Sequence, residues 1–351
     1  MQALGTVIEP DLRRDLVSLN MIRDLKVEGG RVAFSILLTT PACPLKERIE
    51  REAREAVMTV LGVEQVDIHL DAKVTADGRG GRLNLPMKNV IAVASGKGGV
   101  GKSTVAVNFA VALAQAGASV GLMDADVYGP NIPIMMGVRR VPKAANKKIV
   151  PLEAHGVRLM SMGFLVDSEK PLVWRGPMLH SAIRQFLSDV DWGGVDYLVI
   201  DLPPGTGDVQ LTLAQSVPLT GAIIVTTPQP VALSDVRKGV AAFQQLEVPI
   251  IGVVENMSLY ICPQCGHEAH IFAHGGGREV AEQYGVPFLG EIPLDPSVRE
   301  GGDLGRPVIV AAPDSPVAQA FQRVAEAAAQ RISMLNYEQA NRGLIQIMEI
   351  T

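Results

Sequence analysis

The first residues of the chain carry helical and strand-like patterns in turn, and they predict a small mixed unit. An amphipathic stretch at residues 12–25 predicts a helix, and the apolar residues 32–38 predict a strand. A second helical pattern covers residues 45–61, and apolar and polar positions alternate over residues 63–70 as in a half-buried strand. These four elements indicate an α+β unit that has no phosphate-binding loop of its own.

A polar, glycine-rich segment at residues 71–89 follows this unit and favours a flexible linker. We therefore expect a small accessory domain at residues 1–75 and a linker at residues 76–88. A larger domain then covers residues 89–335. The remaining tail at residues 336–351 contains LIQIMEI, which suggests a short strand or a docking segment.

Apolar strands alternate with helical stretches throughout the larger domain. The strand patterns are IAVAS, SVGLMDAD, YLVIDL, AIIVTT, IIGVVEN and FLGEIP, and helical patterns begin at Lys102 and Ser234. This alternation predicts an α/β fold with a mainly parallel sheet flanked by helices. The loops that follow the strands are then expected to hold the active site.

Composition and charge narrow the class of protein. A chain of 351 residues with 47% hydrophobic and 20% charged residues is typical of a globular protein with about two folding units. The net charge of −5 offers no overall attraction to nucleic acid or to an acidic membrane, and no apolar run approaches the roughly 18 residues that span a bilayer. Three cysteines without a disulfide framework favour reduced thiols. We expect a cytoplasmic protein with neither nucleic acid nor a membrane as its partner.

The segment SGKGGVGKST joins the first predicted strand of the larger domain to a helix and fits the pattern G-x-x-x-x-G-K-S/T. In such loops, backbone amides and the helix N-terminus surround phosphate oxygens, Lys102 neutralises β- and γ-phosphate charge, and the Ser103 hydroxyl ligates magnesium. We therefore predict a site that binds ATP with Mg²⁺ and hydrolyses the nucleotide. The predicted nucleotide contacts in this loop are Gly96, Lys97, Gly98, Gly99, Val100, Gly101, Lys102, Ser103 and Thr104.

Further charged residues extend this site. Lys97 is not needed for the basic pattern, and it is either a solvated lysine or a residue that reaches the phosphates of a facing subunit, as an arginine finger does. Asp201 ends the strand YLVIDL and can hold the magnesium shell, and Gly205 can offer its amide to the γ-phosphate. Asp124 and Asp126 follow another strand and can orient the attacking water.

Cys262 and Cys265 form a C-x-x-C pair after the strand IIGVVEN. Two such sulfurs make half of a zinc or iron-sulfur site, and a two-fold dimer supplies four cysteines around one bridging centre. A zinc site completed by His267 and His270, a redox disulfide and a plain turn with buried thiols are the alternatives. We favour the cluster and interpret the two histidines as solvated.

Cys43, in LLTTPACP, lies between a predicted strand and a predicted helix. The helix amides at such a position can lower the pKa of a thiol and leave a nucleophilic thiolate. A half-buried structural cysteine is the other interpretation.

These motifs resemble those of the Mrp-type (ApbC-like) iron-sulfur cluster carrier ATPases, which are P-loop proteins with a deviant Walker A loop. The resemblance rests on SGKGGVGKST, DADVYGPN, DLPPGTGD, ENMS and CPQC, in that order, and it covers most of residues 89–331. The amino-terminal unit resembles the iron-sulfur-assembly domain fused to bacterial members, whose T-x-x-x-C-P pattern occurs here at Thr39, Cys43 and Pro44.

The resemblance implies a homodimer that binds ATP at its interface and carries a 4Fe-4S cluster bridged by the C-x-x-C pairs. Such proteins receive the cluster from a donor and deliver it to apo-proteins. By this match Lys97 acts in trans, Asp126 orients the water and Asn256 reads the adenine. Two departures are Asn131, where the family usually has serine, and the histidines after CPQC; the histidines keep the zinc alternative open.

Three other functions compete with this one. A positioning ATPase of the MinD or ParA type shares the loop but needs a basic tail or patch, whereas the segment QANRGLIQIMEIT has Arg342 as its one cation. A reductase like the nitrogenase iron protein also bridges a cluster across a dimer, but its cysteines do not form a C-x-x-C pair. A zinc-binding P-loop ATPase is the third.

Overall fold

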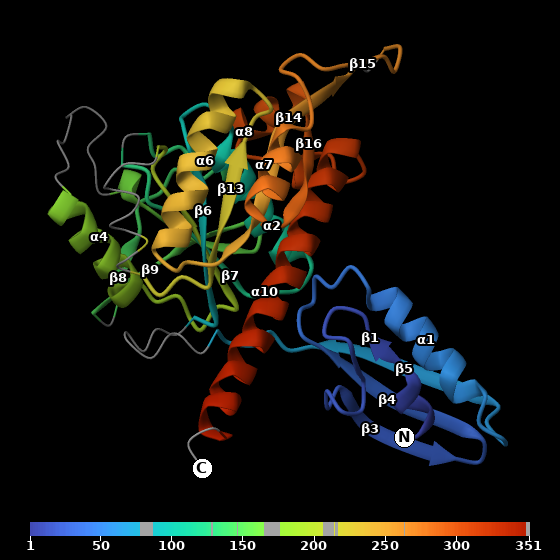
Figure 1. The fold of residues 1–351 in the computed structure, drawn as a ribbon. Helices are drawn as coiled ribbons and strands as arrows, with labels where there is room; N and C mark the ends of the chain where they lie inside the picture. The colour runs from blue at the N-terminus through green and yellow to red at the C-terminus, as the bar shows by residue number, and fades with distance from the viewer. Residues whose placement is uncertain are drawn as a thin grey trace. The chain divides into compact units, whose positions relative to one another are not determined.

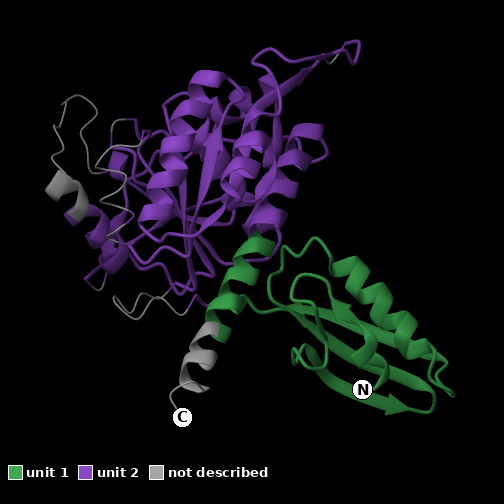
Figure 2. Ribbon diagram, in the orientation of Figure 1, with its two compact units in different colours: residues 1–75, 329–351 green, residues 76–328 purple. Residues whose placement is uncertain are grey.

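The chain divides into two compact units (Figure 2). The first contains residues 1–75 and 329–351, and the second contains residues 76–328. The structure is a computed structural model. It describes residues 1–77, 87–127, 129–145, 147–164, 176–205, 214, 217–262 and 264–348, with the backbone alone for residues 176–180 and 342–348.

The first unit contains a three-stranded sheet in the order β3-β4-β5. β3 and β4 are antiparallel, whereas β4 and β5 are parallel and are joined by helix α1. Alternate residues of β4 are buried, and α1 buries Ile49, Ala53 and Val57 at four-residue spacing, so one face of each forms the core. The strands predicted at residues 32–38 and 63–70 and the helix predicted at residues 45–61 are confirmed. The elements are β1 (Ile8–Glu9), β2 (Arg14–Asp15), β3 (Ile22–Glu28), β4 (Arg31–Leu38), α1 (Lys46–Met58) and β5 (Gln65–Ala72).

The helix predicted at residues 12–25 is wrong. Asp15 Oδ1 accepts the backbone N–H of Ser18 at 2.8 Å, which is a local turn that competes with helical hydrogen bonds. Asn20 and Asp24 have φ angles of 56° and 51°, in the left-handed region that a right-handed helix does not contain. The segment forms turns and the short strand β2, followed by the start of β3.

The second unit is built on a sheet in which the described residues form nine strands (Figure 1). Their order is β10-β11-β7-β12-β6-β13-β14-β15, with β16 beside β14, and all pairs are parallel except β10 with β11 and β14 with β15. The strands β6, β7, β12 and β13 are buried along their whole length, as expected where helices cover both faces. The predicted α/β fold with a mainly parallel sheet is confirmed. The strands are β6 (Asn89–Ser95), β7 (Val120–Asp124), β10 (Leu152–Ala154), β11 (Val157–Ser161), β12 (Tyr197–Asp201), β13 (Gly221–Thr226), β14 (Ile250–Ile261), β15 (Glu268–Ala269) and β16 (Phe288–Leu294), and β8 (Lys143–Ala145) and β9 (Lys148–Val150) form a separate hairpin.

The carboxyl ends of the parallel strands collect polar residues at one edge of the sheet. Asp124 at the end of β7 lies opposite Asp201 of β12 in the strand register and opposite Ser161 of β11 on its other side. The loop after β6 opens at the same edge, where parallel sheets commonly bind ligands. The helices around the sheet are α2 (Lys102–Gln115), α3 (Ile132–Met135), α4 (Gly176–Asp189), α6 (Pro230–Gln245), α7 (Gly276–Tyr284), α8 (Pro296–Asp303), α9 (Val308–Ala311) and the first part of α10 (Pro316–Met348).

Helix α10 is continuous from Pro316 to Met348, so the strand suggested in LIQIMEI is helical as far as Met348. From Ala329 onward this helix belongs to the first unit. Among the described residues, no helix is both long enough and apolar enough to cross a membrane. Of the predicted linker, residues 78–86 lie outside the described residues.

Three hydrogen bonds within the first unit join α10 to the amino-terminal residues. Gln330 Nε2 donates to Asp11 Oδ1 at 2.6 Å, and Asn336 Nδ2 donates to the Thr75 carbonyl at 3.0 Å. Arg14 Nη1 donates to the Tyr337 hydroxyl at 2.8 Å.

A fully buried tryptophan lies against β7 in the core of the second unit. Trp192 has no exposed surface, and its Nε1–H donates to the Phe186 carbonyl at 3.0 Å. A Cβ atom on Gly121 of β7 would lie 2.8 Å from Trp192 Cε3 and 2.9 Å from Leu198 Cδ1. The strand can therefore lie against the indole ring only because residue 121 has no side chain.

We expect Gly121→Ala to lower the free energy of unfolding by about 1–3 kcal/mol, because the added methyl group overpacks a rigid aromatic contact. Guanidinium unfolding followed by circular dichroism measures the change. Gly5→Ala is the matched control, since nothing lies within 4 Å of a Cβ atom there, and it should be nearly neutral. An equal effect of both changes would contradict the assignment of Gly121 to a tight contact.

Candidate functional site

The loop between β6 and α2 can adopt its shape only with glycine at several positions. A Cβ atom on Gly96 would lie 2.5 Å from the backbone carbonyl carbon of Asp235. Gly99 and Gly101 have φ angles of 80° and 81°, which side chains disfavour, and a Cβ atom on Gly101 would lie 2.2 Å from Asn256 Nδ2. These constraints turn the loop amides toward a cavity in front of the α2 N-terminus, as required for binding phosphate oxygens.

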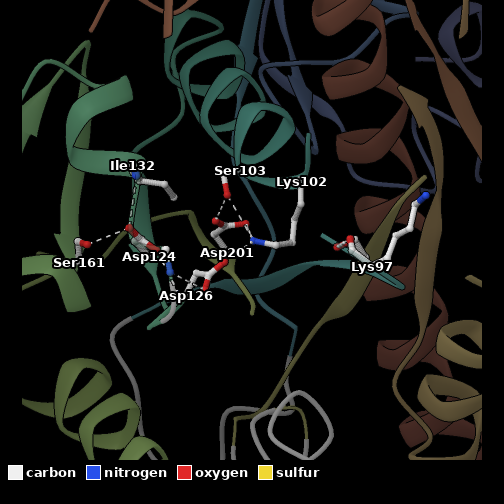
Figure 3. Close-up of polar contacts among 10 residues, drawn as sticks. Lys97, Lys102, Ser103, Asp124, Asp126, Ile132, Ser161 and Asp201 are labelled. Carbon is white, nitrogen blue, oxygen red and sulfur yellow. Dashed lines mark hydrogen bonds and ion pairs between the residues drawn. The ribbon is translucent and has the colours of Figure 1, made fainter. Parts of the chain in front are cut away.

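The charged side chains of the loop meet the ends of β12 and β7 (Figure 3). Lys102 is buried, and its Nζ donates to Asp201 Oδ1 at 2.6 Å and lies 3.7 Å from Asp126 Oδ2. The Ser103 hydroxyl donates to Asp201 Oδ2 at 2.6 Å. Burial is the largest influence on Asp201 and raises the pKa of its carboxyl, although Lys102 opposes the shift. The structure thus brings together Lys102, Ser103 and Asp201, which the sequence assigned to phosphate and magnesium, and places Asp126, predicted to orient the water, next to them.

Asp124 lies beside this group but is turned toward different partners. Its Oδ2 accepts hydrogen bonds from the Ser161 hydroxyl at 2.8 Å and from the Ile132 amide at 3.4 Å, and its Oδ1 accepts from the Asp126 amide at 3.2 Å. Burial, reinforced by the charge of Asp201, raises the pKa of Asp124 to about 8, although these donors oppose the shift. Asp124 therefore holds the Asp126 backbone in place from a carboxyl that is largely neutral at pH 7.

Two adjoining cavities open at this edge of the sheet. One, of about 420 Å³, is lined by the loop glycines with Lys97, Lys102, Ser103 and Asp126. The second, of about 490 Å³, exposes mainly apolar atoms, although Asp295, Arg299 and Asp303 are among its lining residues, and it shares Thr104, Asn131 and Met135 with the first. A polar pocket beside an apolar one suits the phosphates and the base of a nucleotide. The second cavity is lined by Asn131, Ile134, Met135, Asn256, Met257 and Pro293, among others.

Asn256 links the two cavities. Its Nδ2 donates to the Val100 carbonyl of the loop at 2.9 Å, and its side chain lines the apolar cavity, where the predicted adenine contact would lie. The next residue, Met257, has a φ angle of 57°, which is uncommon for a residue with a side chain. This turn lies within β14 and coincides with a break in its register with β16.

Two predicted phosphate contacts are directed elsewhere. The Lys97 side chain extends away from Lys102 (Figure 3), and its Nζ lies 3.4 Å from Gln229 Oε1 as a hydrogen-bond donor. The Gly205 amide donates to the Ser95 carbonyl at 3.0 Å, so contact with a γ-phosphate requires this hydrogen bond to break. Neither residue completes the phosphate site within its own chain in this conformation.

The cysteine pair lies in a hairpin between β14 and β15, which projects from the sheet (Figure 1). The Cys262 amide donates to the His267 carbonyl at 3.0 Å, and the Gly266 amide donates to the Cys262 carbonyl at 2.9 Å. Hydrogen bonds from the amides of Gln264 and Cys265 and from the Cys265 thiol lower the pKa of Cys262, which favours its thiolate. Cys265 is exposed, and both thiols are free.

The described residues do not assemble the single-chain zinc site considered from the sequence. Within them, one group of three or more potential ligands converges, and it consists of Glu255, His274 and Glu291. It contains neither cysteine. The thiols of Cys262 and Cys265 are therefore arranged as an open pair.

The hypothesis that helix amides activate Cys43 is wrong. Helix α1 begins at Lys46, and burial is the dominant influence on the thiol, with Glu9 and Asp11 adding unfavourable charge. Together they raise the pKa of Cys43 to about 11, which outweighs the hydrogen bond from the Leu45 amide. Cys43 packs against the core of the first unit as a neutral thiol at pH 7.

Sequence reasoning missed several residues of the site. Ser161 ends β11, a strand that the apolar pattern did not predict, and its position is visible only through the register with Asp124. Pro293 and Leu294 line the apolar cavity from the end of β16. The predicted strand FLGEIP was a usable signal for them, because every parallel strand of this sheet ends at the same edge.

The fold and the phosphate-binding loop define a P-loop NTPase. Residues 86–329 match the family model described as the NUBPL iron-transfer P-loop NTPase, and residues 1–68 match that of an iron-sulfur cluster assembly protein. An iron-sulfur cluster carrier protein from Synechocystis is 50% identical over 347 residues, which cover 95% of this chain and 97% of the relative. The chain belongs to this family of iron-sulfur cluster carrier P-loop NTPases.

Solved structures share the fold. The nucleotide-binding protein from Archaeoglobus fulgidus in complex with ADP has a TM-score of 0.60 and 38% identity and covers 71% of this chain and 98% of its own. The cell division ATPase MinD from Pyrococcus furiosus has a TM-score of 0.54 and 27% identity, with coverage of 68% and 97%. These structures cover 71% and 68% of this chain, which is about the share that the second unit, residues 76–328, makes up.

The raised pKa of Asp124 predicts a pH dependence of stability. Between the unfolded value of 3.8 and the folded value of about 8, the folded protein retains a proton that the unfolded chain has released. This stabilising contribution is complete below pH 3.8 and is lost as the pH rises through about 8. Relative to Asp124→Asn, the wild-type free energy of unfolding should therefore fall by up to about 1.4 kcal/mol per pH unit.

Urea unfolding of wild type and Asp124→Asn, at intervals from pH 5 to about 8.5, measures this difference. Asp191→Asn, at an exposed position, is the control and should leave the pH dependence unchanged. A stability difference between wild type and Asp124→Asn that stays constant with pH would show that Asp124 is ionised throughout.

Proposed function

We propose that this chain is an ATP-dependent carrier of iron-sulfur clusters. It binds ATP with Mg²⁺ and acts as a homodimer in which Cys262 and Cys265 of both chains hold one bridging 4Fe-4S cluster. It receives the cluster from a donor and delivers it to apo-proteins, and ATP hydrolysis gates the transfer. The observation that carries the proposal is that strand β14 bears both Asn256, bonded to the nucleotide loop, and the hairpin of the thiolate pair.

The side chains of the nucleotide site are suited to bind charged phosphate groups and magnesium. Lys102 can exchange its bond to Asp201 for the β- and γ-phosphates, which frees the Asp201 carboxylate and the Ser103 hydroxyl to hold the magnesium shell. The contacts of Asp201 with Lys102 and Ser103 thus hold these three side chains where, in this proposal, they contact phosphate and magnesium. Bound magnesium supplies charge neutralisation at the phosphates.

Hydrolysis requires a water-orienting group and charge stabilisation. Asp126 lies next to Lys102, and its backbone is fixed by the hydrogen bond to Asp124, so its carboxylate is positioned to orient the attacking water. Lys97 lines its own phosphate cavity, but its side chain extends away from Lys102 and bonds to Gln229, which supports a role in the site of the facing subunit. Each active site is then completed by two chains.

The cysteine pair supports a cluster as the cargo. Two soft ligands from one chain leave an iron-sulfur cluster half ligated, and two-fold symmetry supplies the other two. Cys265 is exposed, and the lowered pKa of Cys262 favours its thiolate, so the pair is suited to bind a metal centre. The names of the curated relatives and the two family models support the same cargo.

A positioning ATPase is the main alternative, because MinD shares the fold. The cysteine hairpin favours the carrier function, because binding to a membrane or to DNA does not require a pair of metal-binding thiols such as Cys262 and Cys265. We therefore propose no nucleic acid or membrane as a partner. A zinc-binding ATPase is the second alternative. If it is correct, the purified protein should contain zinc but no inorganic sulfide.

We expect Lys97→Ala and Asp126→Ala each to retain ATP binding and to lose hydrolysis by about 100-fold or more. An equal mixture of the two variants should recover up to about a quarter of the wild-type rate, because half of the dimers are mixed and each mixed dimer has one complete site. Phosphate release measures the rate. If Lys97 acts within its own chain, the mixture stays as inactive as either variant alone.

We expect wild-type protein reconstituted without oxygen to bind iron and sulfide in equal amounts and to show a broad visible absorption band. Cys262→Ala combined with Cys265→Ala should lose both, because no thiolate pair remains. Cys43→Ala is the control and should retain the full load, since its thiol packs in the core of the first unit.

Two outcomes contradict the cluster. Zinc without sulfide that is lost in His267→Ala would favour the zinc-binding ATPase. ATP-dependent sedimentation of the metal-free protein with liposomes or DNA, together with no uptake of iron, would favour the positioning ATPase.

A further inference from the structure

A second set of metal-ligating side chains lies away from both the nucleotide cavities and the cysteine pair. Strands β14 and β16 are parallel neighbours, and Glu255 lies opposite Glu291 in their register. His274 comes from the segment just before α7. One ligand atom of each residue lies within 4.8 Å of the ligand atoms of the other two. Three segments of the second unit therefore converge on one point.

The charge of this cluster is unbalanced. Adjacent carboxylates on neighbouring strands repel each other, and Glu255 has no exposed surface, so water cannot screen its charge. The Gly275 and Gly277 amides donate to Glu255 Oε1 and Oε2 at 2.9 and 2.6 Å. Each of its oxygens retains a second lone pair, and the two amides orient the carboxylate without neutralising it.

His274 offers the third ligand from the solvent side. Its Nε2–H donates to Glu291 Oε2 at 2.6 Å, and the two side chains are 40% and 34% exposed. An ion can therefore reach the cluster from solvent and take the place of the proton between these two groups, while water occupies its remaining positions. The His270 ring lies 4.8 Å from that of His274 and covers one side of it.

The proposed carrier function uses none of these three side chains. They are absent from the lining of both nucleotide cavities, and the cluster contains no cysteine. A helix cap explains the amide contacts of Glu255, and an ion pair explains His274 with Glu291. Neither explains why a buried carboxylate and a half-exposed one are placed side by side with an imidazole.

We propose that Glu255, His274 and Glu291 bind a divalent first-row transition metal ion. One imidazole nitrogen and two carboxylates are a donor set that suits zinc, cobalt or iron, whereas magnesium prefers oxygen ligands alone. The ion cancels the charge that the two carboxylates leave unbalanced. It also fixes the segment before α7 to the sheet edge formed by β14 and β16.

The test uses the full chain with Cys262→Ser and Cys265→Ser, without nucleotide, so that neither thiolates nor phosphates compete for metal. Cobalt(II) is the probe, and titration calorimetry with visible absorption measures its binding. We expect one tight site per chain with the weak d–d bands of nitrogen and oxygen ligation. In this background His274→Ala and Glu291→Gln should each weaken binding by at least about tenfold.

His69→Ala, which removes an exposed histidine of the first unit, is the matched control and should leave cobalt binding unchanged. Cobalt should also raise the thermal midpoint of the parent, and this increase should be lost in Glu291→Gln, a nearly isosteric change that preserves packing. Far-UV circular dichroism verifies that each variant is folded. The proposal is overturned if the parent binds no cobalt, or if folded His274→Ala and Glu291→Gln bind it as tightly as the parent does.

Discussion

The buried contact between Lys102 and Asp201 organises the active edge of the sheet. A lysine that is only 5% exposed and a fully buried carboxylate are tolerable only as a pair, so each holds the other in place. The same requirement bears on Asp124: beside Lys102, Asp126 and Asp201, its pKa is raised by burial and by the charge of Asp201, and its carboxyl accepts the Ser161 hydroxyl. A nucleotide offers new partners to both members of the pair at once. Nucleotide binding, as we propose it, therefore requires the contact between Lys102 and Asp201 to be exchanged.

Strand β14 connects the nucleotide site with the cysteine pair. Asn256 is bonded to the Val100 carbonyl of the phosphate loop, and the same strand, β14, continues to Ile261 beside Cys262. The left-handed residue Met257 lies within the strand between these two points and coincides with a shift in its register with β16. One strand therefore connects the residue bonded to the phosphate loop with the residues before the hairpin. The metal ion that we propose at Glu255, His274 and Glu291 would bind to the same strand and to its neighbour β16.

Local patterns in the sequence were sufficient to predict the fold and to single out Lys102, Ser103, Asp126 and Asp201, which the structure brings together. Buried strands such as β6 and β12 are continuous apolar runs, and the residues that end them need only the rule that parallel strands share one active edge. The segment at residues 12–25 shows where this reasoning fails, because its helical periodicity competes with an aspartate turn and left-handed residues. Local patterns contain no information on burial or on contacts between residues distant in sequence. They could therefore not predict the position of Ser161 opposite Asp124, the raised pKa of Cys43 or the convergence of Glu255 and Glu291 on His274.

Helix α10 ties the two ends of the described chain into one unit, since its residues from Ala329 onward pack with residues 1–75. Gln330 and Asn336 bond to Asp11 and Thr75, residues that leave the ribosome long before their partners do. The apolar core of the first unit consists of residues between Leu4 and Ala72, so it needs no residue of α10, whereas these polar contacts can form only after the whole second unit has been made. A chain that ends at residue 328 would therefore contain the complete second unit and the core of the first, but none of the hydrogen bonds that α10 makes to residues 1–75.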